Sequence, residues 1–188
     1  MQSRAAKFGI GVMCFFAVLA LGAWGAWHWI VHRIEVRERP PHLVAMTNPQ
    51  PAPDMRFETL DGQQRHLSDY KGKVVVMDLW GTWCIQCVAE MPSMQRLYDH
   101  YRRDPDVQFL IVSRLDTPQN VRAYARRGHF DLPFFVTEDS DIPASMQLHQ
   151  FPSTFVIDKY GKLTSQHAGA ADWSAPGVVA FLDDLKGR

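Results

Sequence analysis

The first part of the chain is a long apolar segment. From Phe8 to Trp27, 20 consecutive residues lack a charged side chain, and the apolar character continues to Val31. A helix of about 20 residues can span the hydrocarbon core of a bilayer. Tryptophans cluster toward the end of the segment, where amphipathic rings favour the membrane interface. The pattern predicts one transmembrane helix over residues 8–31, preceded by a short N-terminus, residues 1–7.

A cleaved signal peptide is the alternative interpretation of this segment. The apolar core of a signal peptide is typically about 7–15 residues long and ends in a small-x-small site, which Ala23 and Gly25 could supply. The length of the apolar run favours an anchor. Basic residues lie on both sides of the run, Arg4 and Lys7 before it and Arg33 after it, so charge alone leaves the orientation open.

The segment that follows is charged and rich in proline. Residues 32–53 contain five prolines, all between Pro40 and Pro53. Such proline density favours an extended, semi-rigid spacer, so we expect a stalk over residues 32–53. No second proline-rich break and no internal repeat follow in the sequence. Residues 54–188 are therefore expected to form one domain.

The rest of the chain alternates between short apolar runs and amphipathic stretches. The strongest run, Val74 to Trp80, contains a single acid, Asp78, as expected for a strand that is buried on both faces. Further strands are expected at 107–112, 134–136, 155–157 and 163–167, and helices at 88–101, 118–127 and 175–185. This order predicts an α/β domain with a central mixed sheet flanked by helices.

Composition and charge narrow the range of functions. The chain is 46% hydrophobic and 21% charged, with 20 basic and 20 acidic residues. These values are typical of a folded protein. Zero formal net charge, with arginines scattered among acids, offers no basic surface for a phosphate backbone. We therefore expect no nucleic-acid partner.

Cys84 and Cys87 lie in the predicted domain, whereas the third cysteine, Cys14, lies in the apolar segment. The pair follows a buried strand and opens a predicted helix, so Cys84 is expected at the helix N-terminus. Unpaired N–H groups and the helix macrodipole stabilise a thiolate there and make it nucleophilic. Cys84 is therefore the candidate that attacks a partner disulfide. Cys87, about one turn further on, is the candidate that resolves the mixed disulfide.

Half of a zinc site is the alternative for two cysteines at this spacing. A structural zinc site needs four ligands. The predicted domain has no second cysteine pair in its sequence, and its histidines show no paired spacing that would complete a site. We therefore expect redox chemistry, with no metal and no other cofactor.

The residues around the pair resemble a known family. Residues 80–87, with the sequence Trp-Gly-Thr-Trp-Cys-Ile-Gln-Cys, and residues 90–92 are similar to the active-site segment of the thioredoxin-like TlpA/ResA family of membrane-anchored thiol-disulfide oxidoreductases. Residues 57–76 resemble that family's entry into the fold, and residues 151–158 resemble its cis-proline loop and the strand after it. The resemblance implies a thioredoxin-like fold for residues 54–188.

The resemblance also implies roles for individual residues. It makes Cys84 the nucleophile and Cys87 the resolving cysteine of a redox-active disulfide. It places Phe151 and Pro152 in the cis-proline loop, packed against the sulfurs, where the Phe151 backbone is left to pair with an incoming substrate strand. An ordinary turn before a strand is the alternative for Pro152.

Three further side chains near the pair are candidates for the site. Trp80 and Trp83 are expected to pack beside the sulfurs and to offer an apolar platform to partners, and plain core packing is compatible with this. Glu90 matches an acid that the ResA-like members use near the dithiol. It could equally be a solvent-facing glutamate in the first turn of the helix, where it favours the macrodipole.

Asp78 lies in the middle of an apolar strand, where thioredoxin itself carries a buried aspartate and TlpA-like relatives often have a different residue. Burial without a partner raises the pKa of a carboxyl group, so Asp78 could pass a proton to or from Cys87. The alternative is a structural acid that is satisfied by Lys73 or by a hydroxyl group.

The sequence departs from the family at Gln86, where most relatives have proline. The residues between the two cysteines influence the reduction potential. The direction of electron flow therefore stays open between a reductase, which the resemblance favours for cytochrome c maturation or other envelope thiols, and an oxidant. A binding or chaperone module without catalysis could keep the same fold.

The resemblance implies a location that charge alone leaves open. It places the domain outside the cytoplasmic (inner) membrane, facing the periplasm or the exterior, with residues 1–7 in the cytoplasm. The expected partners are thiols or disulfides of envelope proteins and a membrane-bound electron donor.

Overall fold

The structure is a computed structural model, and it describes residues 18, 20–25, 40–41, 43–148 and 150–188. The chain divides into two units, Met1–Arg37 and Glu38–Arg188. In the first unit, residues 18 and 20–25 are helical. Within the described ranges, no helix is long and apolar enough to cross a membrane. The N-terminus predicted over 1–7, most of the anchor predicted over 8–31 and the first part of the stalk lie outside the described residues.

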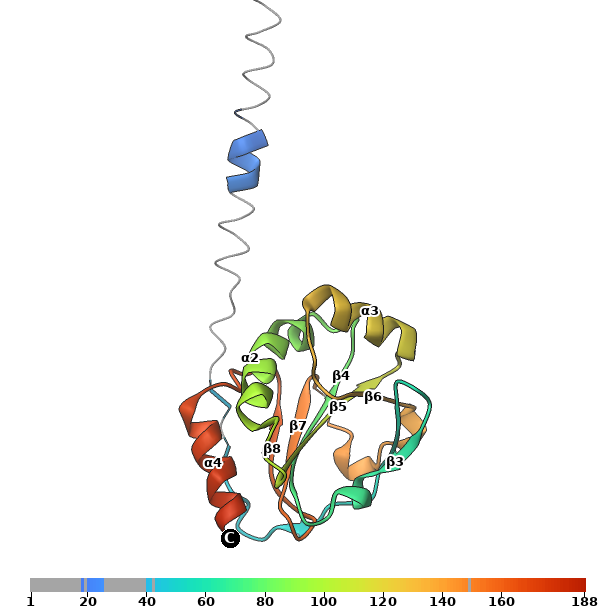
Figure 1. Ribbon diagram of the computed structural model, residues 1–188, viewed down its shortest axis with the longest axis vertical. Helices are drawn as coiled ribbons and strands as arrows, with labels where there is room; N and C mark the ends of the chain where they lie inside the picture. Colours follow the sequence, from blue (N-terminus) through green and yellow to red (C-terminus); the bar gives the residue numbers. More distant parts are fainter. Residues whose placement is uncertain (1–17, 19, 26–39, 42, 149) are drawn as a thin grey trace, which may run out of the picture. The chain divides into compact units, whose positions relative to one another are not determined.

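The second unit, as far as it is described, is built on an eight-stranded sheet with the order β1-β8-β7-β4-β5-β6-β2-β3 (Figure 1). β4, β5 and β6 are parallel to one another, and the other neighbouring pairs are antiparallel, so the sheet is mixed, as predicted. The strands are β1 (Gln50–Pro51), β2 (Arg56–Thr59), β3 (Gln64–His66), β4 (Val74–Trp80), β5 (Val107–Arg114), β6 (Phe134–Thr137), β7 (Ser153–Ile157) and β8 (Lys162–Ala168).

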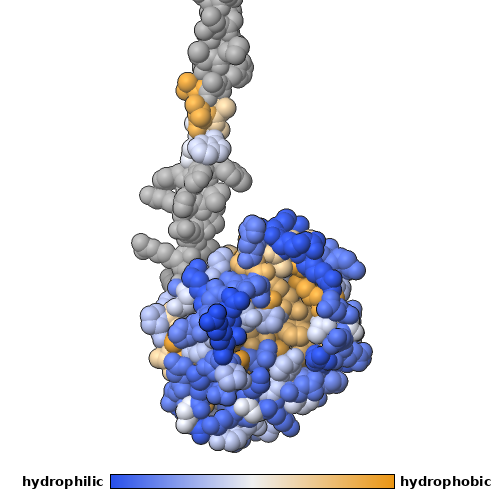
Figure 2. All heavy atoms as spheres, in the orientation of Figure 1, coloured by the Kyte–Doolittle hydropathy of each residue, from blue (hydrophilic) through white to orange (hydrophobic). Residues whose placement is uncertain are grey.

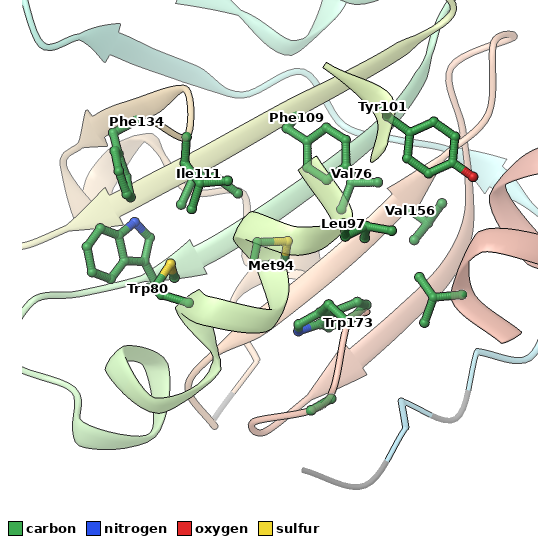
Figure 3. Packing of buried hydrophobic residues seen from close by; sticks show 14 of the residues in the cluster. Val76, Trp80, Met94, Leu97, Tyr101, Phe109, Ile111, Phe134, Val156 and Trp173 are labelled. Carbon is green, nitrogen blue, oxygen red and sulfur yellow. The ribbon is translucent and has the colours of Figure 1, made fainter. Parts of the chain in front are cut away.

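Helices cover one face of this sheet. They are α2 (Ile85–Tyr101), α3 (Pro118–Gly128) and α4 (Pro176–Gly187), and all three contribute to one hydrophobic core (Figure 1). Figure 3 shows Leu97 of α2 beside Val76 of β4, with Trp173 from the loop before α4 on the same side of the sheet. The helical layer and the sheet together form the α/β domain that the sequence predicts.

The opposite face of the sheet carries a second core. Because side chains alternate along a strand, Val75, Met77 and Leu79 of β4 point away from the helices and into this core. Two short 3-10 helices, η1 (Leu67–Tyr70) and η3 (Ala144–Met146), contribute side chains to this core, whereas a third, η2 (Asp139–Asp141), has no buried residue. Figure 2 shows hydrophobic residues near the centre of one face of the domain, with hydrophilic residues around them.

The predicted strands and helices are confirmed, with bounds that shift by a few residues. The largest shift is at α2, which begins at Ile85 and not at residue 88. The sequence does not predict β2 and β3. β3 is a short and polar edge strand without an apolar run.

The stalk expected over residues 32–53 differs from the structure in its last part. The Met46 N–H donates to the Thr164 carbonyl at 2.8 Å, and β1 pairs with β8 at one edge of the sheet. Pro51 fits this position because a residue without an N–H group is tolerated in an edge strand. The domain therefore includes part of the proline-rich segment.

Candidate active site

The two cysteines lie at the start of α2. Cys84 is the N-cap residue of the helix, and it forms a disulfide bond with Cys87, with 5.3 Å between the two Cα atoms. The Cys87 N–H donates to Cys84 Sγ at 3.2 Å. Cys84 keeps 9% of its surface exposed, whereas Cys87 is fully buried. This difference in access favours attack on a partner by Cys84 and resolution by Cys87.

The cis-proline loop lies against the dithiol segment. The Phe151–Pro152 peptide bond is cis, which confirms the cis loop that the resemblance implies. The rings of Phe151 and Trp83 meet edge to face, with 5.7 Å between their centroids. The residue before Cys84 and the residue before the cis-proline are thus in direct contact.

The two tryptophans before the cysteines lie in different environments. Trp83 is 51% exposed, whereas Trp80 has no exposed surface and packs against Tyr124 and Phe134 in the core (Figure 3). Trp80 therefore matches plain core packing and has no side-chain surface for a partner. Other large apolar side chains exposed near the start of α2 and the end of β5 include Ile85, Val88 and Leu115.

Asp78 lies beneath α2. Alternation along β4 puts it on the same face as Val76 and Trp80, and this is the face that α2 covers. Its side chain is fully buried, and burial raises the pKa of Asp78 to about 7. The Thr154 hydroxyl donates to Asp78 Oδ1 at 2.9 Å and acts in the opposite direction, lowering this pKa. Of the two partners that the sequence left open for Asp78, Lys73 or a hydroxyl group, the structure shows a hydroxyl group, that of Thr154 in β7.

Glu90 lies one turn after Cys87 and is fully buried. Its Oε2 atom accepts hydrogen bonds from the indole Nε1–H of Trp173 at 2.9 Å and from the Ala171 N–H at 3.1 Å. The solvent-facing alternative for Glu90 is therefore wrong. The carboxylate instead ties α2, just behind the dithiol, to the loop between β8 and α4.

The hydrogen bond between Trp173 and Glu90 leads to a prediction for stability. Trp173→Phe removes the Nε1–H donor but keeps an aromatic ring, so we expect the free energy of unfolding to fall by about 1–3 kcal/mol, as when a buried acceptor loses a hydrogen-bond donor. Denaturant unfolding monitored by circular dichroism measures this loss.

Trp80→Phe is the matched control for this variant. Trp80 is equally buried, but its Nε1–H has no hydrogen-bond partner among the described residues. The same truncation of the ring then loses packing alone and should cost less than Trp173→Phe. Equal losses in the two variants would contradict a specific contribution of the bond to Glu90.

The end of β5 and the loop after it also contact the dithiol segment, which the sequence did not predict. The indole Nε1–H of Trp83 donates to the Arg114 carbonyl at 3.2 Å. The Arg114 guanidinium lies 4.6 Å from the centre of the Phe151 ring and pairs with Asp139. The next residue, Leu115, has a φ of 56°, which non-glycine residues rarely adopt. No local sequence pattern indicates these contacts, because they join segments far apart in the chain.

No group of three histidine, cysteine or acidic side chains within the described part of the chain could hold a metal ion. The Cys84–Cys87 pair is a disulfide in the structure. The chemistry that these residues can perform is thiol–disulfide exchange.

The fold and the site define a thioredoxin-like domain with a Cys-x-x-Cys disulfide at the start of a helix. A family model described as "AhpC/TSA family" matches residues 49–166. The chain belongs to this family.

Individual relatives agree with this assignment. The thiol-disulfide oxidoreductase ResA of Geobacillus thermodenitrificans is 36% identical over 112 residues, which are 60% of this chain and 64% of that protein. The chain thus spans somewhat less than two thirds of the length of this relative. The thioredoxin-like protein YneN of Bacillus subtilis is 34% identical over 128 residues, which are 67% of this chain and 74% of that protein.

Solved structures show the same fold. A crystal structure from Bacteroides vulgatus, of a protein proposed to be a thiol-disulfide oxidoreductase, is 30% identical, with a TM-score of 0.64 over 73% of this chain and 96% of that one. The exposed lipoprotein thioredoxin Etrx1 of Streptococcus pneumoniae is 25% identical, with a TM-score of 0.57 over 72% of this chain and 100% of that one.

Proposed function

We propose that this protein is a thiol-disulfide oxidoreductase that reduces disulfides of envelope proteins by dithiol exchange at Cys84 and Cys87. The observation that carries the proposal is the disulfide between an N-cap cysteine that keeps 9% of its surface exposed and a fully buried cysteine one turn further along α2. The similarity to ResA of Geobacillus thermodenitrificans, which is a thiol-disulfide oxidoreductase, supports it.

The reaction begins from the reduced dithiol. The Cys84 thiolate attacks one sulfur of the partner disulfide, forms a mixed disulfide and releases the other partner sulfur as a thiolate. Cys87 then attacks Cys84 Sγ, which forms the Cys84–Cys87 disulfide and releases the second partner thiolate. Two electrons pass to the partner, and a membrane-bound dithiol donor returns two electrons to restore the reduced protein.

The surroundings of the dithiol support this sequence of steps. The Phe151 backbone, next to the cis-proline, is the proposed pairing site for an extended segment of the partner. The exposed ring of Trp83 is the proposed apolar contact beside it. Buried Asp78, whose pKa is raised, is the proposed proton acceptor for the Cys87 thiol. Buried Glu90, one turn after Cys87 on α2, is proposed as a second acidic side chain that influences the dithiol.

We further propose that residues 8–31 anchor the protein in the cytoplasmic membrane, with residues 1–7 in the cytoplasm and the domain outside. The apolar run and the TlpA/ResA resemblance support this location, and cytochrome c maturation is the substrate class that the resemblance favours. Fusion of alkaline phosphatase to the C-terminus of the full chain tests the topology. The fusion should be active, because alkaline phosphatase folds to its active form outside the cytoplasm.

The equilibrium reduction potential of the Cys84–Cys87 pair tests the direction of electron flow. A potential near about −270 mV or below favours a reductase, whereas one near about −120 mV favours an oxidant with the same residues. Incubation of the full chain in glutathione or dithiothreitol buffers, followed by thiol alkylation and mass spectrometry, measures this value. Gln86 makes the measurement necessary, because it lies between the cysteines where the resemblance leads us to expect proline.

A further inference from the structure

The dithiol segment is held through several hydrogen bonds by the end of β5 and the loop after it. The carboxylate of Asp116, which lies just after β5, accepts the Thr82 N–H at 2.8 Å and the Thr82 hydroxyl at 2.7 Å. The Ser113 hydroxyl donates to the same carboxylate at 2.6 Å. The next residue of the dithiol segment, Trp83, donates its indole N–H to the Arg114 carbonyl. Two consecutive residues before Cys84 are thus attached to the end of β5 and to the loop after it.

This attachment lies within a turn that leads into the helix. The Cys84 N–H donates to the Gly81 carbonyl at 3.1 Å, which makes residues 81–84 a closed turn with Thr82 inside it. The turn determines where Cys84 Sγ lies relative to the first N–H groups of α2. The Cys87 N–H already reaches this sulfur at 3.2 Å. Such a bond weakens steeply as its angle and distance become less favourable.

The loop has features of a built positioning element. Ser113 is fully buried at the end of β5, so its hydroxyl is held in place by the core of the domain. Asp116 accepts three hydrogen bonds, two of which come from Thr82. Leu115, between Arg114 and Asp116, has a backbone conformation with φ of 56° that is unfavourable for its residue type. Unfavourable backbone conformations of this kind cluster at functional sites.

We propose that Asp116 is a positioning residue for the dithiol. Through Thr82 it fixes the turn before α2, so that the Cys84 thiolate formed on reduction keeps its hydrogen bond from the Cys87 N–H. The inference rests on the proposed function in taking Cys84 as the nucleophile. Its test, however, is the acidity of the Cys84 thiol, which can be measured whether or not the protein reduces a given partner.

Thr82→Val and Thr82→Ser separate the hydrogen bond from the shape of the side chain. Valine keeps the branched shape and loses the hydroxyl, so we expect the acid dissociation constant of the Cys84 thiol to fall about threefold, as for loss of one hydrogen bond. Serine keeps the hydroxyl and should leave the constant near its wild-type value. The rate of Cys84 alkylation as a function of pH, followed by mass spectrometry in the reduced full chain, gives the constant.

Replacing Asp116 then shows whether Thr82 acts through this carboxylate. In an Asp116→Ala background, Thr82→Val should change the Cys84 acidity by less than half as much on a logarithmic scale, because the acceptor is already gone. Asp116→Leu serves the same purpose if the alanine variant does not fold, since leucine is similar in size to aspartate and has no acceptor oxygen. The other charged groups around the dithiol, Asp78, Glu90 and the Arg114–Asp139 pair, are the same in all these variants.

Glu138→Gln is the control for a general effect of charge. Glu138 lines the same surface cleft as Asp116, which also contains Glu58 and Thr117. Removing this exposed carboxylate should leave the effect of Thr82→Val at its full size. Equal effects of Thr82→Val and Thr82→Ser, or an undiminished effect of Thr82→Val without the Asp116 carboxylate, would overturn the proposal.

Discussion

Cys84→Ser is expected to lower the disulfide reductase activity of the full chain by at least about a thousandfold. A serine hydroxyl is almost entirely protonated at neutral pH and does not replace the thiolate in exchange with a disulfide. Cys87→Ser should also block turnover, but for a different reason, because the first attack still occurs and the mixed disulfide then persists. Reduction of insulin with dithiothreitol as electron donor measures turnover. The trapped mixed disulfide is detected by non-reducing gels with mass spectrometry after the pre-reduced variant has been freed of dithiothreitol, which would cleave it, and mixed with insulin.

Cys14→Ser is the matched control, since it removes the cysteine that lies outside the dithiol and should leave turnover unchanged. Trapping of the partner by Cys84→Ser and not by Cys87→Ser would reverse the proposed order of attack. Full binding of a partner by the variant that lacks both cysteines, together with no reduction by the wild type, would instead favour the non-catalytic binding module.

Much of the fold is predictable because its signals are local. β4 is a continuous apolar run, and its side chains are buried on both faces of the sheet as the run predicts. Thr117 and Pro118 mark the start of α3, and in the structure the Thr117 side chain accepts the Asn120 N–H. Edge strands lack such signals. β1 consists of Gln50 and Pro51, and nothing in those two residues specifies β8, far along the chain, as their partner strand.

The candidate site also has a part that local sequence signals predict and a part that they do not. The cysteine pair and its helix are local in sequence, so the apolar strand before the pair and the helical stretch after it predict the position of Cys84 at the start of α2. The contacts that support the pair are not local. Thr82 and Asp116 are 34 residues apart, and Glu90 and Trp173 are 83 residues apart. A single sequence offers no periodicity that would join such residues, and the partners of Glu90 emerge only when α2 and the loop before α4 pack together.

Asp78→Asn is expected to remove a pH dependence of stability. Burial raises the pKa of Asp78 to about 7 in the folded protein, whereas an aspartate in the unfolded chain titrates near about 3.9. Between these two values the folded protein binds more protons than the unfolded chain. The free energy of unfolding therefore falls as the pH rises from about 4 to about 7. The contribution of Asp78 to the free energy of unfolding is fully present below about pH 4 and lost above about pH 7.

The asparagine variant cannot ionise at this position, so it should be more stable than the wild type at pH 8, by as much as about 4 kcal/mol. At pH 4 the two proteins should differ little, because the Asp78 carboxyl is then protonated in the fold. Urea unfolding at a series of pH values measures the difference. Thr154→Val is the companion variant. It removes a hydrogen bond that lowers the Asp78 pKa, so the fall in the free energy of unfolding should extend to higher pH than in the wild type.

The same substitution tests the proposed role of Asp78 in the reaction. Ionised Asp78 can accept the proton of the Cys87 thiol as Cys87 attacks the mixed disulfide, and asparagine cannot. We therefore expect this resolution step to slow by about a hundredfold at pH 7.5 and to lose its inflection near pH 7. Rapid acid quenching of the reduced protein mixed with a disulfide substrate follows the step. An unchanged rate combined with higher stability would make Asp78 a structural acid whose hydrogen bond from Thr154 is its main interaction.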